Sequence, residues 1–416
     1  MSQVAIVGAY NTRFGARVRR DAEGVLEDLA PLHELLVEAG RGAIADAGLE
    51  ASEIDGVWIG SCSPGLLANQ EHLGPLATEI DAGGLLHKRT TRTEAACASS
   101  SVALYDAVYA VEAGRCRHAL VIGVEKMNLA GTAAVTRALA CSSYWPEEGG
   151  AGMTFPGVFA VLARAYQAEY ALDDELFARM RATVAALSYR NGARNPIAHF
   201  GPDAAPARRG LICAEAILAL PPQSNPIVAA PLRLHDCSPI TDGAAALVVA
   251  SASAARGREK VVELAGIGHA AARMPLSRRD RLYALDGARA AALQAYAEAG
   301  VTERDLEFAE VHDCFTNAQL LCVEALGLSA PGRAGFDYLD GRFTPEDRTP
   351  VNLSGGLKAK GHPVGATGAS MHVHAYRQLV GEPLGVPHPG RPEVGAVLNV
   401  GGSGATNCVS ILRRVR

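Results

Sequence analysis

Short apolar runs alternate with alanine-rich helical stretches along the first part of the chain. The apolar runs cover residues 4–9, 57–60, 118–124 and 244–250, and residues 35–47 and 96–113 carry apolar positions at helical spacing. Short apolar runs separated by helices are typical of strands buried in a parallel or mixed sheet. The pattern therefore predicts an α/β fold built from βαβ units.

The pattern changes between about residues 123 and 231 and then returns. Glycine and proline clusters such as EEGGAGMTFPG and LPPQSNP interrupt two helix-like pieces there, which predicts an inserted loop domain that covers a site. From Val261 a strand, a helix at about 286–298, a strand at 308–312 and another helix follow. A duplication is inferred from this order of elements alone, with an N-terminal half at 1–255 that includes the loop domain and a C-terminal half at 256–416.

Charge and hydropathy argue against two classes of protein. A net charge of -5 and a sequence pI of about 6.2 oppose general nucleic-acid binding, which needs a basic surface. The apolar runs fall short of the roughly 18–20 residues of a membrane-spanning helix. The nine cysteines lack the spacing of a disulfide framework or a CxxC zinc site. We therefore expect a cytoplasmic protein with reduced thiols, no nucleic-acid partner and no membrane segment.

Cys97 is the first candidate for catalysis. In TRTEAACASSSVAL it lies where a polar strand end passes into small residues and an alanine-rich helix. Unpaired amides and the helix dipole at such a position lower the pKa of a thiol and make it a better nucleophile. A buried structural cysteine is the alternative, because small-residue turns between strand and helix are common.

Two later motifs supply histidines and a second thiol. His362 lies in KGHPVGATGAS, where proline fixes the local geometry and glycines let the backbone approach a ligand, and it can accept a thiol proton. In EVHDCFTNA, His312 and Cys314 are two positions apart, so an extended segment projects both to one side. The histidine would donate to an oxyanion and the thiol would act as acid and base. Metal binding competes with this interpretation, but no second His/Cys cluster has ligand-like spacing.

The glycine-rich NVGGSGAT sequence near the C-terminus indicates a tight turn between two strands. It lacks the Lys-Ser/Thr pair of a phosphate-binding P-loop and does not open a long helix. Backbone amides at such a turn can instead form an oxyanion hole.

Taken in order, these motifs resemble the thiolase superfamily over essentially the whole chain. The resemblance rests on EAACASSSVAL, CSPITDGAAALVV, EVHDCF, KGHPVGATGAS and the terminal glycine-rich turn. It implies the thiolase fold, in which two similar βαβαβ-type halves pack into a five-layer α/β/α/β/α arrangement and a loop domain is inserted in the first half. Many thiolases have an Asn-Glu motif in place of His-Asp-Cys and a second catalytic cysteine at the position of Asn399. A thiol at Cys314 is the pattern of sterol-carrier-protein type thiolases and their archaeal and bacterial relatives.

The resemblance also implies a role for each candidate. Cys97 becomes acylated, and His362 activates it and shares an oxyanion hole with His312. Cys314 removes or returns the α-proton of the second thioester. The backbone amides of Cys97 and Gly401 hold the other oxyanion.

Three further residues receive weaker assignments from the resemblance. Ser238, which opens SPITDG, falls where thiolases contact the pantetheine or adenylate part of coenzyme A, although a simple turn role is nearly as well supported. His199 lies in a stretch that resembles a family loop near the substrate, and a packed loop histidine is the favoured interpretation. Cys408, on the expected last strand, is interpreted as structural.

The function implied is a thiolase-type acyltransferase of lipid metabolism. It would cleave 3-ketoacyl-CoA with coenzyme A, or condense acyl-CoA with acetyl-CoA, through an acyl-Cys97 intermediate. Coenzyme A thioesters are the substrates, and no metal, nicotinamide or flavin is required. The resemblance also implies a homodimer or tetramer.

Four alternatives stay open. They are acyl transfer to a non-CoA carbon nucleophile, a retro-aldolase, a ketoacyl synthase, and a subunit that works beside a small zinc-ribbon/OB-fold partner. The retention of Cys97 opposes a retro-aldolase, which needs no acyl carrier. Cys314 beside His312 favours a thiolase over a ketoacyl synthase.

Overall fold

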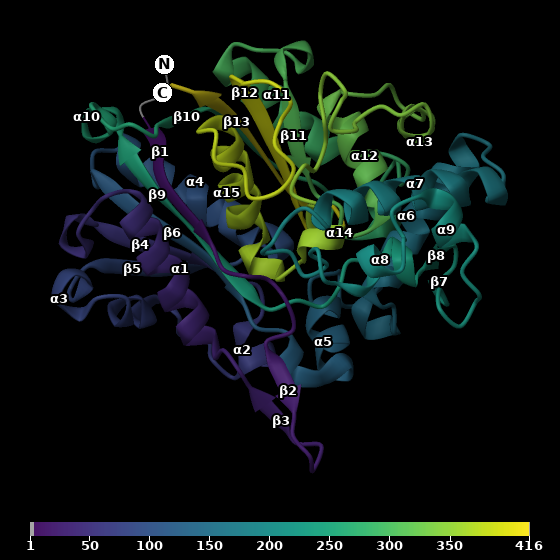
Figure 1. The fold of residues 1–416 in the computed structure, drawn as a ribbon, viewed down its shortest axis with the longest axis horizontal. Helices are drawn as coiled ribbons and strands as arrows, with labels where there is room; N and C mark the ends of the chain where they lie inside the picture. The colour runs from purple at the N-terminus through teal and green to yellow at the C-terminus, as the bar shows by residue number, and fades with distance from the viewer. Residues whose placement is uncertain (1–3, 416) are drawn as a thin grey trace.

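The computed structural model describes residues 4–415, whose main feature is one large mixed sheet. Its nine strands follow the order β11-β12-β13-β10-β1-β9-β6-β4-β5, with β1 in the middle (Figure 1). The strands of the first half are β1 (Val4–Asn11), β4 (Gly56–Gly60), β5 (Arg89–Thr93), β6 (His118–Glu125) and β9 (Gly243–Ser251). Those of the second half are β10 (Val262–Ala271), β11 (Phe308–Val311), β12 (Val394–Gly401) and β13 (Thr406–Arg414).

The two halves of the sheet share one topology. In the first half, β4 pairs in parallel with β5 and β6, and the pairs β6–β9 and β9–β1 are antiparallel. In the second half, β11 pairs in parallel with β12, and the pairs β12–β13 and β13–β10 are antiparallel. The counterpart of β5 is reduced to a parallel bridge between Ala309 and Val351. The duplication expected from the order of elements is therefore visible in the strand pairing.

The half-sheets are joined edge to edge, which the sequence did not predict. The first strands of the two halves, β1 and β10, pair antiparallel at Ala5↔Glu263 and Ile6↔Val262. Helices that contact the strands of each half also contact one another between the half-sheets. The register of this join depends on contacts between distant segments, and no local pattern reports it.

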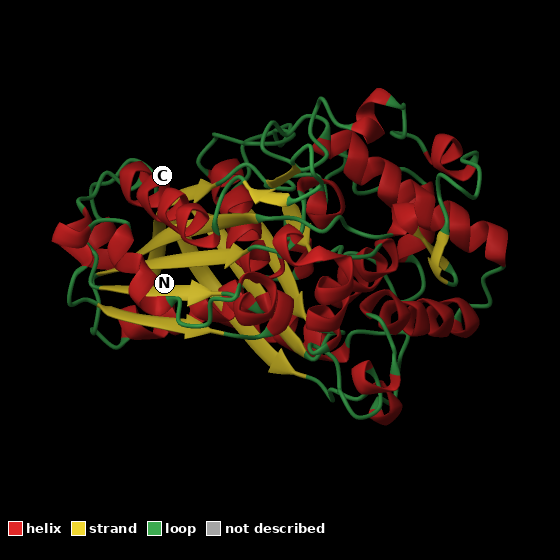
Figure 2. Ribbon diagram, turned by 90° about the horizontal axis from the view of Figure 1, so that it is seen from below, coloured by secondary structure: helices red, strands yellow, loops and turns green. Residues whose placement is uncertain are grey.

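Helices complete the five layers. The helices that cover the sheet are α1 (Leu32–Asp46), α4 (Ser99–Glu112), α11 (Asp286–Ala299) and α15 (Thr367–Leu379). α1 packs on β1, β9 and β6, and α11 packs on β10 and β13. Between the half-sheets, α4 packs on β4 and β6, and α15 packs on β9 and β12. Figure 2 shows helices on both faces of the sheet, and the α/β/α/β/α arrangement expected from the sequence is confirmed.

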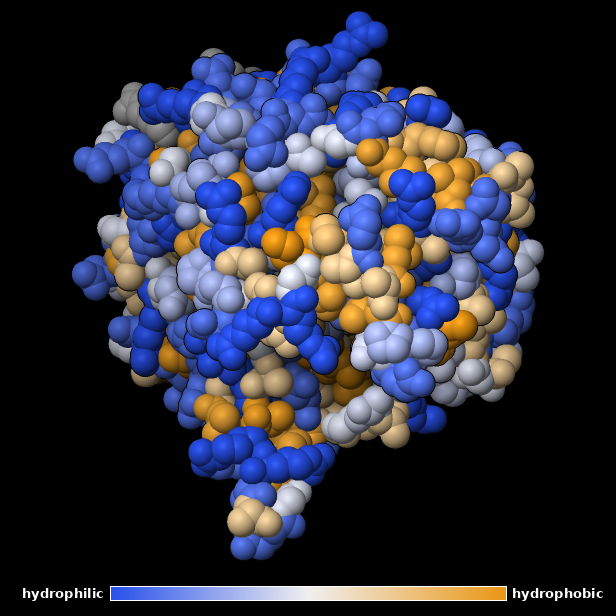
Figure 3. All heavy atoms as spheres, turned by 45° about the vertical axis from the view of Figure 1, so that its right-hand side comes forward, coloured by the Kyte–Doolittle hydropathy of each residue, from blue (hydrophilic) through white to orange (hydrophobic). Residues whose placement is uncertain are grey.

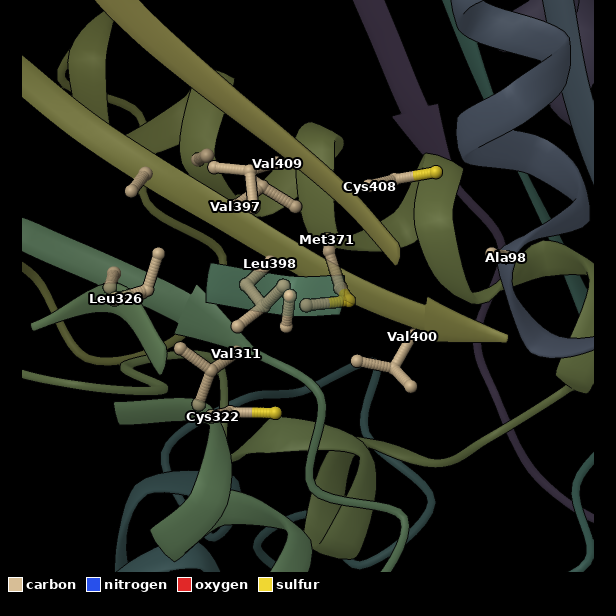
Figure 4. Close-up of a cluster of buried hydrophobic side chains, with 14 of the residues drawn as sticks. Ala98, Val311, Cys322, Leu326, Met371, Val397, Leu398, Val400, Cys408 and Val409 are labelled. Carbon is tan, nitrogen blue, oxygen red and sulfur yellow. The ribbon is translucent and has the colours of Figure 1, made fainter. Parts of the chain in front are cut away.

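Alternate residues of one strand serve different layers. On β6, Leu120 and Ile122 belong to the core under α1, whereas Ala119 and Val121 belong to the inner core. Figure 4 shows part of that inner core, where the Cys408 side chain lies among valine, leucine and methionine side chains. Cys408 is 1% exposed, which fits the structural role assigned to it.

The segment between β6 and β9 forms a largely helical body at one end of the sheet (Figure 1). Its elements are α5 (Gly131–Ala140), α6 (Phe155–Glu169), α7 (Asp174–Gly192), α8 (Ala205–Arg208), α9 (Ala214–Leu218), β7 (Ile227–Ala229) and β8 (Leu232–Arg233). The remaining elements are β2 (Val18–Arg20), β3 (Leu26–Asp28), α2 (Pro64–Ala68), α3 (Ala82–Leu85), α10 (Ala252–Ala255), α12 (Thr316–Leu326), α13 (Ala334–Leu339) and α14 (Gly356–Lys360). Within residues 4–415, none of the helices combines the length and apolar character needed to cross a bilayer.

The contact between α11 and β10 provides a test of this packing. A Cβ added at Gly268 would lie 1.8 Å from the carbonyl oxygen of Ala291, so Gly268→Ala must push the helix from the strand. We expect the free energy of unfolding to fall by about 1–3 kcal/mol, the usual cost of overpacking. The control is Gly15→Ala, because nothing lies within 4 Å of the added Cβ at that position. Equal midpoints for the two variants in thermal or urea unfolding would contradict the packing described.

Candidate active site

Cys97 lies where β5 leads into α4. A single 3-10 turn, Ala96–Ala98, precedes the first residue of the helix. Ala96 has a φ of 52°, in the left-handed region that costs a non-glycine residue about 1–2 kcal/mol. The turn is held by the Ser99 hydroxyl, which donates to the Ala96 carbonyl, and by the Glu94 carboxylate, which accepts the Ala96 amide. This strained turn places Cys97 inside the protein, 1% exposed.

Burial dominates the acidity of the Cys97 thiol. Its exclusion from water raises its pKa to about 12. The Gly402 backbone amide hydrogen-bonds the thiol and lowers the pKa, and the charge of Glu125 raises it, but both effects are smaller than that of burial. The lowered pKa expected from the helix end is therefore wrong for this thiol at rest. A base must take the proton when Cys97 reacts.

His362 has a free lone pair for that proton. Its Nδ1 lies 2.7 Å from Oγ1 of Thr367, whose hydroxyl donates to the Pro363 carbonyl at 3.0 Å. Because that hydroxyl hydrogen is already used, Nδ1 of His362 must donate, and Nε2 keeps its lone pair. Burial, and secondarily the charge of Lys360, lowers the pKa of His362 to about 3. His362 is thus a neutral imidazole at physiological pH.

His312 lies beside the Cys97 thiol. The ligand-forming atoms of Cys97, His312 and His362 all lie within 4.8 Å of one another, and the two imidazole rings meet edge to face with centroids 5.3 Å apart. Nδ1 of His312 lies 3.0 Å from Nδ2 of Asn399, whereas its buried Nε2 has no hydrogen-bond partner among the described residues. Burial, followed by the effect of His362, holds the pKa of His312 well below its ordinary value.

Cys314 faces the cavity in which Cys97 and His362 also lie. The cavity measures about 150 Å³, and Cys314 is 2% exposed. Burial, and then the nearby Cys97 thiol, raises the pKa of Cys314 well above its ordinary value. Most of the remaining wall is apolar and includes Met127, Val135, Leu139, Phe155 and Val364. The structure thus brings together all four side chains that the sequence singled out for catalysis.

Ser238 lines the same cavity, and its backbone amide donates to the Cys314 carbonyl at 2.9 Å. His199 is a packed loop residue, because its Nδ1 bonds Oγ1 of Thr241 at 3.0 Å and its amide donates to the Lys360 carbonyl. A contact between Ser238 and coenzyme A stays a prediction.

The amide that reaches Cys97 belongs to Gly402, one residue beyond the glycine chosen from the sequence. Gly401 is the last residue of β12, and an added Cβ there would lie 2.3 Å from the Ala95 carbonyl oxygen. Gly402 has a φ of 61°, which lets the chain turn immediately after the strand. Gly401 as an oxyanion donor stays a prediction, and the structure adds Gly402 as the neighbouring candidate.

A buried carboxylate that the sequence analysis missed joins the segment after β4 to the KGHPVGATGAS motif. Glu125, at the end of β6, accepts the backbone amides of Cys62, Ser63 and Gly365 at 2.7, 3.2 and 3.0 Å. Its burial raises its pKa to about 7. Glu125 thereby fixes the turn that follows His362. A charged residue directly after the apolar run 119–124 was the available signal.

Asp313 plays a similar part between His312 and Cys314. Its carboxylate accepts the amides of Leu357 and Lys358, at 2.5 and 3.3 Å, in the first turn of α14. Burial raises the pKa of Asp313 to about 7. Because α14 leads directly to His362, Asp313 connects the two histidine motifs.

The site therefore offers a thiol that can act as a nucleophile, a neutral imidazole that can take its proton, and a second thiol, all at one largely apolar cavity. Acyl transfer needs this set, since a tetrahedral intermediate must form on a nucleophile that loses its proton and must collapse again.

Two family models match the chain. "Thiolase, N-terminal domain" matches residues 4–253, and "Thiolase C-terminal domain-like" matches residues 268–414. An acetyl-CoA acetyltransferase of Methanothermobacter thermautotrophicus is 36% identical, with 100% of each chain covered. Human sterol carrier protein 2 is 27% identical, with 92% of this chain and 67% of that protein covered. The solved structure of the Ltp2-ChsH2(DUF35) aldolase matches with a TM-score of 0.79 at 22% sequence identity. The match covers 100% of this chain and 98% of the chain in that structure.

These similarities agree with the geometry of the site and confirm the resemblance to sterol-carrier-protein type thiolases. They also confirm the prediction of an acyltransferase. The chain belongs to the thiolase family.

Proposed function

We propose that the chain transfers acyl groups between coenzyme A thioesters, condensing two acyl-CoA molecules or cleaving 3-ketoacyl-CoA, with Cys97 as the acyl carrier. The main support for the proposal is that Cys97, His362 and Cys314 line one cavity. His312 lies beside Cys97 and His362. The similarity to an acetyl-CoA acetyltransferase supports acetyl-CoA as one substrate.

The first half-reaction acylates Cys97. The thiol gives its proton to Nε2 of His362, and the sulfur attacks the thioester carbonyl. The backbone amides of Cys97 and Gly402 donate to the oxyanion. When this tetrahedral intermediate collapses, the bond between the carbonyl carbon and the coenzyme A sulfur breaks. The leaving coenzyme A thiolate takes the proton of Cys314.

The second half-reaction forms the carbon-carbon bond. The Cys314 thiolate removes an α-proton from the second thioester, a task that suits a thiol with a raised pKa. The enolate oxygen accepts hydrogen bonds from Nε2 of His312 and of the protonated His362. The enolate carbon then attacks the carbonyl carbon of the acyl group on Cys97. The Cys97 sulfur leaves as a thiolate and recovers its proton from His362. All protons are thus returned, and thiolysis is the reverse path.

Other features support a short acyl group and a reducing compartment. A cavity of about 150 Å³ with apolar walls suits a short acyl chain. The mechanism needs two free thiols, and all nine cysteines are free, which favours the cytoplasm.

The assembly is proposed on surface features. β5 ends the sheet with its RTTRT sequence, and a second copy could add to this edge to form a homodimer. The face that carries α6, α7 and α9 shows apolar side chains among charged ones (Figure 3), and Leu218, Ile227 and Leu234 are exposed in that segment. Such a surface suits a small partner protein, and the neighbouring aldolase structure contains ChsH2(DUF35) beside Ltp2.

We expect the purified protein to cleave acetoacetyl-CoA or a longer 3-ketoacyl-CoA when coenzyme A is added. Cys97→Ala should abolish turnover, because no acyl carrier remains. Cys314→Ala should lower kcat by about 10²–10⁴-fold, the usual contribution of general acid-base catalysis. Loss of the ketothioester absorbance reports the rate.

Cys213→Ser serves as the matched control, because Cys213 is exposed and does not line the cavity that holds Cys97 and Cys314. Mass spectrometry of protein incubated with acetyl-CoA should show one acetyl group, absent from Cys97→Ala and present in Cys314→Ala. Inert protein with acylated Cys97 would redirect the proposal to another acceptor or a missing partner. Protein that is neither active nor acylated would refute it.

The resting protonation state of Cys97 has its own test. Because burial raises the pKa of the thiol to about 12, the thiolate fraction should grow tenfold per pH unit across the neutral and alkaline range. The rate of Cys97 alkylation by iodoacetamide should rise accordingly between pH 7 and 9, whereas free cysteine levels off above about 8.5. A plateau between pH 5 and 8 would instead reveal a thiolate paired with protonated His362.

A further inference from the structure

Asn399 connects the helix of the nucleophile to His312. It lies on β12 and is completely buried. Its Oδ1 accepts the hydroxyl hydrogen of Ser101 at 2.8 Å, and its Nδ2 lies 3.0 Å from Nδ1 of His312. Ser101 belongs to the first turn of α4, four residues after Cys97. Each polar atom of the Asn399 side chain thus has a defined partner.

These contacts decide which nitrogen of His312 carries hydrogen. The Ser101 hydroxyl donates to Oδ1, so the other end of the Asn399 amide is the NH₂ group, which can only donate. Nδ1 of His312 must therefore accept. A neutral imidazole has a single ring hydrogen, and it must lie on Nε2. That Nε2 is buried without a partner among the described residues, so an unused N–H remains beside Cys97 and His362.

We propose that Asn399 is a positioning residue that fixes His312 as the tautomer with hydrogen on Nε2, so that this N–H can donate to the enolate oxygen. The proposal rests on the proposed function for the enolate, while the tautomer itself is independent of it. Asn399 does not touch the substrate and acts through His312. His362 is held in the opposite tautomer by Thr367, so the two histidines are set as one donor and one acceptor.

The proposal links two departures noted in the sequence. A histidine stands where many thiolases have an asparagine, and Asn399 stands where many have a catalytic cysteine. An asparagine donor has no tautomers, whereas a histidine can present either a hydrogen or a lone pair. A thiol at position 399 would offer only a weak donor to Nδ1. The amide at 399 is therefore what makes a histidine at 312 usable as a donor.

The same assignment bears on metal binding by Cys97, His312 and His362. A metal needs the lone pair of each histidine nitrogen that faces it. In the proposed tautomer, Nε2 of His312 presents a hydrogen instead. Asn399→Asp should reverse this, because a carboxylate accepts hydrogen from Nδ1 and leaves the lone pair on Nε2, as in carboxylate-histidine-metal arrangements.

The experiment compares wild type, Asn399→Asp and Asn399→Ala. Co²⁺ is titrated at alkaline pH, where the imidazole of the Asp variant is not doubly protonated, and binding is followed by thiolate-to-cobalt absorption. We expect Asn399→Asp to bind Co²⁺ at least about tenfold more tightly than wild type, within the range known for groups that orient metal-binding histidines. Adding Cys97→Ala should remove the gain. Asn317→Asp is the matched control, because Asn317 is also buried and its side-chain amide donates to the Phe159 carbonyl. This variant should bind Co²⁺ no more tightly than wild type.

Turnover gives the second readout. Asn399→Asp should lower the kcat of condensation by about 10²–10³-fold, the cost of losing one oxyanion donor, with little change in KM. Asn399→Ala should lose less, because His312 then still populates the required tautomer. A merely structural role predicts the reverse order, since Asp preserves the shape of Asn and Ala does not.

The proposal is overturned if Asn399→Asp binds Co²⁺ no more tightly than wild type, or if it retains more activity than Asn399→Ala. Should the Asp variant fail to fold, ¹⁵N-histidine spectra of the wild type decide the matter, with the His312 signal assigned by its loss in His312→Gln. A signal of the opposite tautomer overturns the proposal. The cobalt and NMR readouts need no turnover, so failure of thiolysis alone would refute only the proposed function.

Discussion

Exclusion of water from the reacting groups is the constraint on which the rest of the site depends. Cys97, His312, Cys314 and His362 are all buried, and burial is the largest influence on the pKa of each. A buried group cannot exchange protons freely with solvent, and its neutral form is favoured. The resting site is therefore uncharged at its centre. In the proposed reaction, charge develops only on a substrate carbonyl inside this buried site, where each hydrogen-bond donor has most effect.

The same constraint gives a role to residues that never meet a substrate. In a site buried from solvent, protein partners decide the direction of each hydrogen bond. Thr367 decides it for His362, and Asn399 and Ser101 decide it for His312. Glu125 and Asp313 do the same for the backbone, since each gathers amides from segments distant in sequence. The four candidate catalytic side chains form only the inner part of a larger polar network.

The sequence predicted the fold class and the motifs well because both depend on local pattern. Strands such as β6 and β9 are short apolar runs, and the candidate catalytic residues lie at strand ends or helix starts, with glycine and proline marking the position of His362. Predictions from the sequence failed for features that depend on contacts between distant segments. The acidity of Cys97 was misjudged because a helix start is visible in sequence, whereas the depth of burial is not. The pairing of β1 with β10, the contact from Gly402 and the anchoring by Glu125 are likewise contacts between segments far apart in the chain.

The repeated strand topology has a consequence for how the chemistry is divided. Cys97 precedes α4 and His362 precedes α15, and these helices occupy equivalent places in the two halves, each entered through a 3-10 turn. The equivalent strands β6 and β12 carry Glu125 and Asn399, and each of these residues reaches across to the helix start of the opposite half, at Gly365 and Ser101 respectively. The candidate active site thus lies between two equivalent helix starts, one of which carries the thiol of Cys97 and the other the imidazole of His362. Neither half supplies the whole set by itself, because Cys97 belongs to the first half and both histidines and Cys314 belong to the second, so a nearly symmetric arrangement of strands and helices holds an asymmetric set of side chains.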